Sequence, residues 1–168
     1  TQVYDTAVRS LDRARAAIPG WFGTLPAAPC EVVEMARHEA EHSTIAYYRE
    51  PAADGSRPGR YYINTAHAET RPRYEAEALA FHESIPGHHL QLHVANAHPS
   101  LTRLMTDAAE FVEGWGMYTQ QLMSEEGYLN NSKELRLTWL KQKMRGLANA
   151  ILDVRLQTMG MTDQQALD

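Results

Sequence analysis

The sequence predicts a mainly α-helical domain with a small β element. Four stretches space their apolar residues three and four apart, as the buried face of a helix requires: 4–18, a stretch that begins at Arg73, 100–126 and 133–159. The run 60–64 (RYYIN) is instead rich in aromatic and β-branched residues and follows turn-forming sequence, which is typical of a strand. Because the helical stretches cover most of the chain, the strand predicts only a minor sheet or hairpin.

Length and composition indicate a single globular domain. The chain has 168 residues, of which 43% are hydrophobic and 22% are charged, as is ordinary for a protein with one apolar core. A net charge of −5 argues against nucleic acid as a partner. No apolar run is long enough to cross a membrane, and Thr1 opens no signal-peptide pattern. We therefore expect a soluble protein, with a cytoplasmic or exported location and the oligomeric state left open.

The N-terminal part is predicted to form one helix and then a loop. Over 4–18, Val8, Leu11 and Ala14 lie on one apolar stripe, and Pro19-Gly20 ends the helix. A proline-rich loop follows over 19–30. The segment 32–36 fits a short strand or the start of a helix equally well.

The run 38–42 (HEAEH) matches the H-E-x-x-H pattern of zinc peptidases. In that pattern, two histidines four residues apart share one helix face and bind one zinc ion. The surroundings weaken the match, because Glu41 places a charge inside the motif and the flanks 34–46 lack a continuous apolar face. Since mixed-charge runs of this kind are usually solvated surface, we do not place the chemistry here.

The turn-rich segment 51–59 leads into the predicted strand 60–64. A strand beside a cleft holds an extended peptide when its free edge pairs with the peptide backbone. An ordinary sheet edge or hairpin arm is the alternative for this segment.

The run 82–89 (HESIPGHH) offers a second set of histidines. Pro86 stands where H-E-x-x-H would place its second ligand, and His88 and His89 follow. On an ideal helix His88 would lie about 240° around the axis from His82, and His89 about 10.5 Å along it. A regular helix therefore forms no metal site here, since each ring must come within about 2 Å of the ion.

A bulge over 85–87 would change this geometry. Proline lacks a donor N–H and glycine tolerates unusual dihedral angles, so both weaken a regular helix at this point. If two extra residues are absorbed in the bulge, His88 reaches the place of the second ligand. We therefore favour His88 and keep His89 as the alternative.

The predicted helix 100–126 carries a carboxylate, Glu113, within an apolar run. A carboxylate in such a place requires an ion pair or a metal ion, and the residues alone favour neither. Gly114 and Gly116 weaken the helix, which indicates the close approach of another backbone or a ligand. Tyr118 is a candidate hydrogen-bond donor to a developing oxyanion, with core packing as an equal alternative.

The last long helix is predicted over 133–159, and Thr162 is predicted to cap a further helix that starts there. The residues expected on the inner face of the long helix are Leu137, Leu140, Met144, Leu147, Ile151 and Leu152.

Two segments together carry a resemblance to a known family. The runs 82–91 (HESIPGHHLQ) and 111–118 (FVEGWGMY) resemble the bacterial domain-of-unknown-function 885 family, whose hallmarks are HExxPGH and a later EGWxxY. The segment 54–65 is similar to the family's strand before the motif helix. That family resembles the glutamate-zincins, mostly helical metallopeptidases whose third ligand is a glutamate from a later helix. The resemblance implies one zincin-like domain over 1–168, which is a portion of a longer chain.

The resemblance also implies a function. His82, His88 and Glu113 would hold one Zn²⁺ and leave a fourth position for water. Glu83 would act as general base on that water, with Tyr118 as a candidate helper, in the hydrolysis of a peptide or small amide. Two alternatives stay open: a metal-dependent amidohydrolase acting on small modified peptides, and a non-catalytic domain with a structural metal site or a packed polar cluster.

Overall fold

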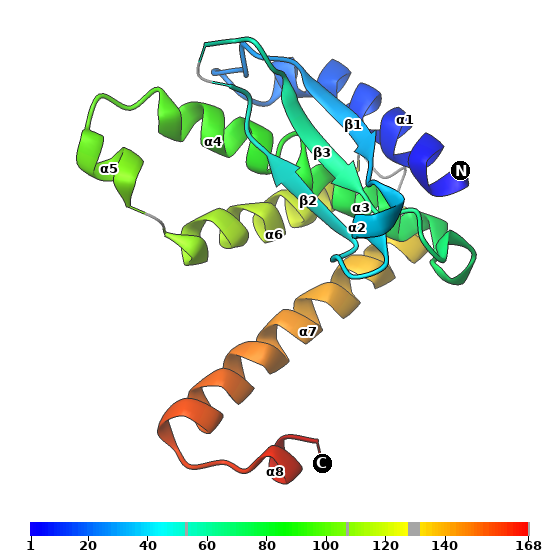
Figure 1. Cartoon of the computed structure of the whole chain (residues 1–168), viewed down its shortest axis with the longest axis vertical. Coiled ribbons are helices and arrows are strands. Elements are labelled where there is room, and N and C mark those ends of the chain that lie inside the picture. Colours follow the sequence, from blue (N-terminus) through cyan, green and yellow to red (C-terminus); the bar gives the residue numbers. More distant parts are fainter. Residues whose placement is uncertain (53, 107, 128–131, 168) are drawn as a thin grey trace.

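The computed structural model describes residues 1–52, 54–106, 108–127 and 132–167. It is mainly helical with one three-stranded sheet, which confirms the predicted fold class. In Figure 1 the sheet lies in front of helix α3 (Arg73–Glu83), and helix α1 (Gln2–Ala17) lies beside them. The core forms where these three elements meet, and its fully buried members include Ala7, Tyr61, Ala80 and Phe81.

Helix α1 confirms the first predicted helix and begins two residues earlier than expected. The backbone N–H of Tyr4 donates to the Thr1 hydroxyl, which caps the helix at 3.3 Å. Leu11 and Ala14, both from the predicted stripe, are buried against the core. A short 3-10 turn (Ile18–Gly20) ends the helix at the predicted proline and glycine.

The sheet places the predicted strand at its centre. Strands β1 (Cys30–Glu34), β2 (Ala46–Arg49) and β3 (Gly59–Ile63) have the order β1-β3-β2, with β1 parallel and β2 antiparallel to β3. The open choice over 32–36 is thereby resolved in favour of a strand for its first part. Of the two readings of 60–64, the hairpin arm is confirmed, because β3 pairs with the preceding strand β2 in antiparallel orientation. The pairing of a peptide with a free edge is wrong, because β1 and β2 occupy both edges of β3.

The predicted helix 100–126 is wrong as a single helix. The chain forms α5 (Leu101–Met105) and α6 (Ala109–Glu125), with extended backbone at Thr106. The Thr106 hydroxyl donates to the Thr102 carbonyl at 2.7 Å, a side-chain bond that competes with helix continuation. Helix α6 packs against α3 and against α4 (His88–Asn96), which follows α3 after a break.

Helix α7 (Lys133–Thr158) contacts the body only near its start. Ser132 caps it, and Leu135 and Thr138 are the buried residues of the helix, next to α3 and α6. Towards its C-terminal end α7 runs away from the body and carries α8 (Asp163–Leu167) at its far end (Figure 1). Thr162 accepts a hydrogen bond from the Gln165 N–H, as the predicted cap requires.

The predicted inner face of α7 is wrong. The sequence of α7 correctly predicted that its apolar residues form a stripe. The body of the protein, however, packs against a different side of the helix. Five of the six residues expected to be buried are exposed: Leu137, Leu140, Met144, Leu147 and Ile151.

Candidate metal centre

The break between α3 and α4 brings the second histidine into range of the first. The Ser84 N–H makes a last helical bond to the Ala80 carbonyl at 3.0 Å, and the His89 N–H donates to the Ser84 carbonyl at 3.0 Å. A Cβ atom at Gly87 would lie 1.8 Å from the His82 carbonyl oxygen, so the turn accepts only glycine. The interruption predicted over 85–87 is therefore present.

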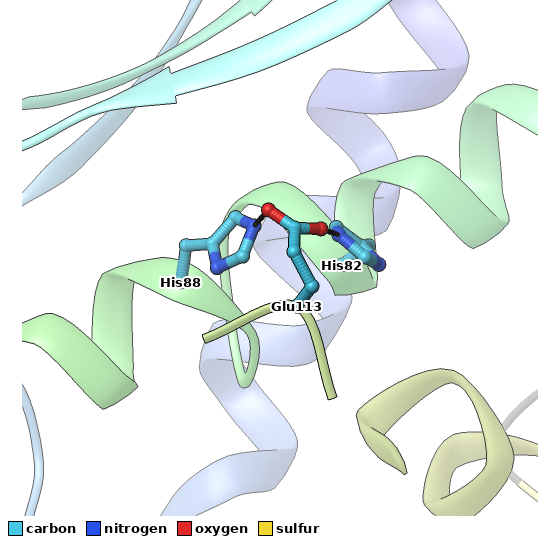
Figure 2. Close-up of side chains that lie close together, drawn as sticks. All are labelled: His82, His88 and Glu113. Carbon is cyan, nitrogen blue, oxygen red and sulfur yellow. Dashed lines mark hydrogen bonds and ion pairs between the residues drawn. The ribbon is translucent and has the colours of Figure 1, made fainter. Parts of the chain in front are cut away.

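Three candidate ligands meet at this break. Figure 2 shows the Glu113 carboxylate between the rings of His82 and His88. His82 Nε2 lies 3.2 Å from Glu113 Oε2, and His88 Nε2 lies 3.7 Å from Glu113 Oε1. One ligand atom from each residue lies within 4.8 Å of the other two. Among the described residues, this is the one group of three or more such side chains that is close enough to share an ion.

The donor set fits a zinc ion. Tetrahedral bonds of 2.0–2.1 Å place ligand atoms about 3.3 Å apart. The histidine–carboxylate separations of 3.2 Å and 3.7 Å, each to a different Glu113 oxygen, are close to this value, and the whole set lies within 4.8 Å. Two imidazoles and one carboxylate leave a fourth position open. The side chains of His82 and His88 are only 12% and 8% exposed, whereas that of Glu113 is 66% exposed, so solvent reaches the site past the carboxylate.

Helix α6 packs tightly on the first histidine. A Cβ atom at Gly116 would lie 2.5 Å from His82 Cε1, so the absence of a side chain makes room for the ring. The Thr119 hydroxyl donates to the Gly116 carbonyl at 2.8 Å and lies 3.3 Å from the Phe81 carbonyl, which ties α6 to α3. Gly116 thus fulfils the predicted close approach, whereas a Cβ at Gly114 would meet nothing within 4 Å.

The structure separates the roles of the two adjacent histidines. The buried His89 ring accepts from the Tyr48 hydroxyl through Nδ1 at 2.6 Å and donates through Nε2 to the Ala28 carbonyl at 2.9 Å. Both of its ring nitrogens are thereby used within the fold. The pKa of His88 is lowered to about 4 by burial and by the nearby His82. Its ring is therefore neutral near pH 7, the form that binds a metal ion.

The two carboxyl groups at the centre differ in their environments. Burial raises the pKa of Glu83 to about 7; the Glu113 charge adds to this rise and His82 opposes it. The hydrogen bond from His82 lowers the pKa of Glu113. A pair of carboxyl groups whose pKa values are pushed apart is typical of a proton-transfer site with one acid–base group and one permanent anion.

Tyr118 is not brought into the cluster. It lies five residues after Glu113, about 140° further around α6, and its half-exposed ring packs on Trp115 at 5.7 Å between centroids. Its role as a helper stays a prediction. Trp115, the tryptophan of the EGWxxY motif, for which the sequence analysis predicted no role of its own, donates from its indole N–H to the Pro86 carbonyl at 2.9 Å and braces the break between α3 and α4.

The literal motif at 38–42 forms no comparable site. Helix α2 (Arg37–Ala40) has four residues and ends before His42, so the two histidines share no helix face. His38 and His42 are exposed, and Glu39 accepts a hydrogen bond from the Tyr47 hydroxyl at 2.7 Å. This agrees with the prediction that the chemistry lies elsewhere.

A groove of about 790 Å³ lies beside the centre but does not contain it. It is mainly apolar and runs between α4, α5 and α6, with Leu90, Leu104 and Phe111 in its lining. Trp115 also lines this groove and bonds to Pro86, so it links the groove to the break between α3 and α4.

Fold and site together define a mainly helical domain with a candidate three-ligand metal centre. The chain belongs to the family described as "Bacterial protein of unknown function (DUF885)", whose model matches residues 1–168. Among solved structures it is similar to "the putative lipoprotein from Colwellia psychrerythraea", with a TM-score of 0.88 and 26% sequence identity. The match covers 98% of this chain but 28% of that one, so the chain spans less than a third of the solved protein's length.

No curated protein matches the chain. Within the described part of the structure, no helix combines the length and the apolar character needed to cross a bilayer.

Proposed function

We propose that the chain carries the centre of a zinc-dependent hydrolase, most simply a metallopeptidase. The observation that supports this proposal is the meeting of His82, His88 and Glu113, with ligand atoms within 4.8 Å of one another, next to the buried Glu83. Three ligands and an open position are the arrangement of catalytic rather than structural zinc sites. The resemblance of the HExxPGH and EGWxxY motifs to the glutamate-zincins points the same way.

The protein's own residues have distinct tasks in this proposal. His82 and His88 would bind the ion as neutral imidazoles, and Glu113 would supply the negative charge. A bound Zn²⁺ would polarise a scissile carbonyl and lower the pKa of a water molecule towards neutrality. Glu83 would accept a proton from the attacking water and deliver it to the leaving amine, a role that suits a carboxyl group whose pKa is about 7.

The proposed substrate is a peptide or a small amide. Solvent reaches the centre on the side of Glu113, so a substrate would approach from there. Because the solved relative is much longer, we propose this activity for the centre of a longer protein, to which segments outside the 168 residues contribute. That relative is described as a "putative lipoprotein", which is consistent with an exported location.

The test compares two glutamates that each follow a histidine. Metal content and hydrolysis of a peptide library are measured for the wild type, Glu83→Gln and Glu39→Gln. We expect Glu83→Gln to keep its zinc and lose about 100-fold or more in rate, the usual contribution of a general base. Glu39→Gln should match the wild type in both measurements.

Other outcomes separate the alternatives. Hydrolysis of small amides but of no peptide would indicate an amidohydrolase. Zinc without any hydrolysis by the wild type would indicate a structural site. Equal rates for the wild type and Glu83→Gln would remove Glu83 as the base, and a purified protein that binds no zinc would refute the proposal.

A further inference from the structure

Helix α7 exposes a regular apolar stripe. Its members alternate three and four residues apart along the helix and are each between 40% and 69% exposed: Leu137, Leu140, Met144, Leu147, Ile151 and Val154. Figure 1 shows α7 running away from the body towards its C-terminal end, and the contacts of its first half with α6, such as that of Lys143 with Gln121, do not cover these side chains. The stripe is therefore an apolar surface that the described part of the chain leaves uncovered.

The spacing of the stripe fits a second helix. Apolar residues at alternating intervals of three and four define the seam of a coiled coil, in which two residues of every seven face the partner. A helix that lies on a membrane presents a broader apolar face, commonly with aromatic residues. The stripe contains no aromatic residue, and from Leu137 to Val154 it extends about 25 Å.

The charges beside the stripe constrain the partner. The positions that flank a coiled-coil seam carry only basic charges between 136 and 155, namely Arg136, Lys141, Lys143 and Arg155. All four are exposed, and the Lys143 ammonium lies 4.9 Å above the Trp139 ring. A second copy paired along this seam would bring basic flanks together in either orientation, and such like-charge pairs are destabilising.

We propose that this stripe docks an amphipathic helix outside these 168 residues, with Asp or Glu at the positions that flank its own seam. Charge complementarity with the basic flanks of α7 supports an acidic partner. The similar solved chain is much longer, since this chain covers 28% of it, so that relative has further chain from which such a helix could come. The proposal concerns a surface separate from the metal centre and does not depend on zinc.

The test uses two synthetic helical peptides with the same Leu and Ile seam over about four heptads. One peptide carries Glu at all flanking positions and the other carries Lys, so each repels itself and only the sign of the charge differs. Binding of the labelled peptides to the 168-residue protein is measured by fluorescence anisotropy. We expect the Glu peptide to bind at least about tenfold more tightly at low salt, and the preference to shrink near 0.5 M salt.

Variants of α7 identify the surface. The exposed Met144→Asp/Leu147→Asp pair should weaken the Glu peptide at least about tenfold. Leu101→Asp, at an exposed apolar residue of α5, should leave binding unchanged. The charge reversal Lys141→Glu/Lys143→Glu should favour the Lys peptide. Circular dichroism of each variant verifies that it is folded.

Several results would overturn the proposal. If both peptides bound equally well, or if neither bound, the partner would not be an acidic helix. A dimer in sedimentation that Met144→Asp/Leu147→Asp dissolves would show that a second copy covers the stripe. Binding to phosphatidylserine vesicles that the same variant abolishes, without any preference between the peptides, would indicate a membrane surface instead.

Discussion

Two segments of this molecule carry a histidine followed by a glutamate and a later histidine. They differ in the spacing of the histidines, in local structure and in burial. The segment 38–42 has the regular spacing of a zinc motif, yet its helix has only four residues and its histidines are exposed. The segment 82–88 has irregular spacing, yet its two rings are at most 12% exposed and their centroids lie 4.8 Å apart.

The difference between the two segments lies in what surrounds them. The segment 82–88 joins two helices of the body, and a third helix supplies Glu113 and the space at Gly116. The segment 38–42 lies between two strands, and its Glu39 bonds to Tyr47. A metal site needs ligands from converging elements, so the number of residues between two histidines is weaker evidence than the packing that orients them.

The largest expected effect comes from removing one ligand. Zinc binding at structural sites is worth about 10–16 kcal/mol over four ligands, or roughly 3 kcal/mol per ligand, which is more than about 100-fold in affinity. We therefore expect His88→Ala to weaken zinc binding by at least that factor in a competition titration with a chelator. His42→Ala is the matched control and should bind zinc like the wild type. If His88→Ala and His42→Ala lost the same zinc affinity, the segment 82–88 would not be the zinc site that distinguishes it from 38–42.

The sequence predicted much of this centre but not its details. Pro86 and Gly87 indicated an interruption because neither residue favours a regular helix. The sequence favoured His88 but left His89 open, since the role of His89 depends on Tyr48 and Ala28, which lie far away in the chain. The apolar neighbours of Glu113 suggested burial, but its side chain is mostly exposed, because a periodic pattern does not show which side of a helix is covered.

The same physical limit explains the errors in the fold. The heptad pattern of α7 was sufficient to predict a helix with an apolar stripe. It could not reveal that the body packs against Leu135 and Thr138 instead. Strand β3 was recognised from its aromatic and β-branched residues, but its central place depends on pairing with β1, some 29 residues earlier in register, which local sequence does not encode.

A second prediction concerns the fold stability of the metal-free protein. Burial raises the pKa of Glu83 from 4.5 to about 7, so the folded state disfavours its charged form. Glu83→Gln removes that cost, and its stability relative to the wild type should rise as the pH increases from 4.5 through 7. Above pH 7 the gain should approach about 3 kcal/mol, the value that corresponds to this shift.

Urea denaturation in the presence of a chelator, at pH 4 and pH 8, measures this gain. Glu39→Gln serves as the control, because Glu39 belongs to the segment 38–42 and its side chain is accessible to solvent. A Glu83→Gln gain that is the same at both pH values would contradict the buried, charge-disfavouring environment assigned to Glu83.

A third prediction uses two glycines of α6 that are two residues apart. In Gly116→Ala the added methyl group meets the His82 ring, which must turn away from the position that it shares with His88 and Glu113. We expect zinc affinity to fall about tenfold, as for the loss of a group that orients a ligand. In Gly114→Ala the methyl group meets nothing within 4 Å, so zinc affinity should be unchanged.

Helix propensity provides an independent check on the glycine pair. Alanine is favoured over glycine within a helix by about 0.5–1 kcal/mol, so Gly114→Ala should also raise the thermal unfolding temperature. If both variants kept full zinc affinity, close packing of α6 on His82 would not be what orients the ring.

The smallest expected effect compares two neighbouring tyrosines of β2: Tyr47 bonds to Glu39 of the segment 38–42, and Tyr48 bonds to His89, directly after the segment 82–88. Tyr48→Phe leaves the buried Nδ1 of His89 without its hydroxyl donor, which should cost about 1 kcal/mol of stability. Tyr47→Phe removes the bond to the half-exposed Glu39, where water can replace it, and should cost less than about 0.5 kcal/mol. Zinc affinity should change in neither variant, because His89 supports the fold and the proposed ligand is His88. A loss of zinc affinity confined to Tyr48→Phe would instead make His89 part of the metal centre.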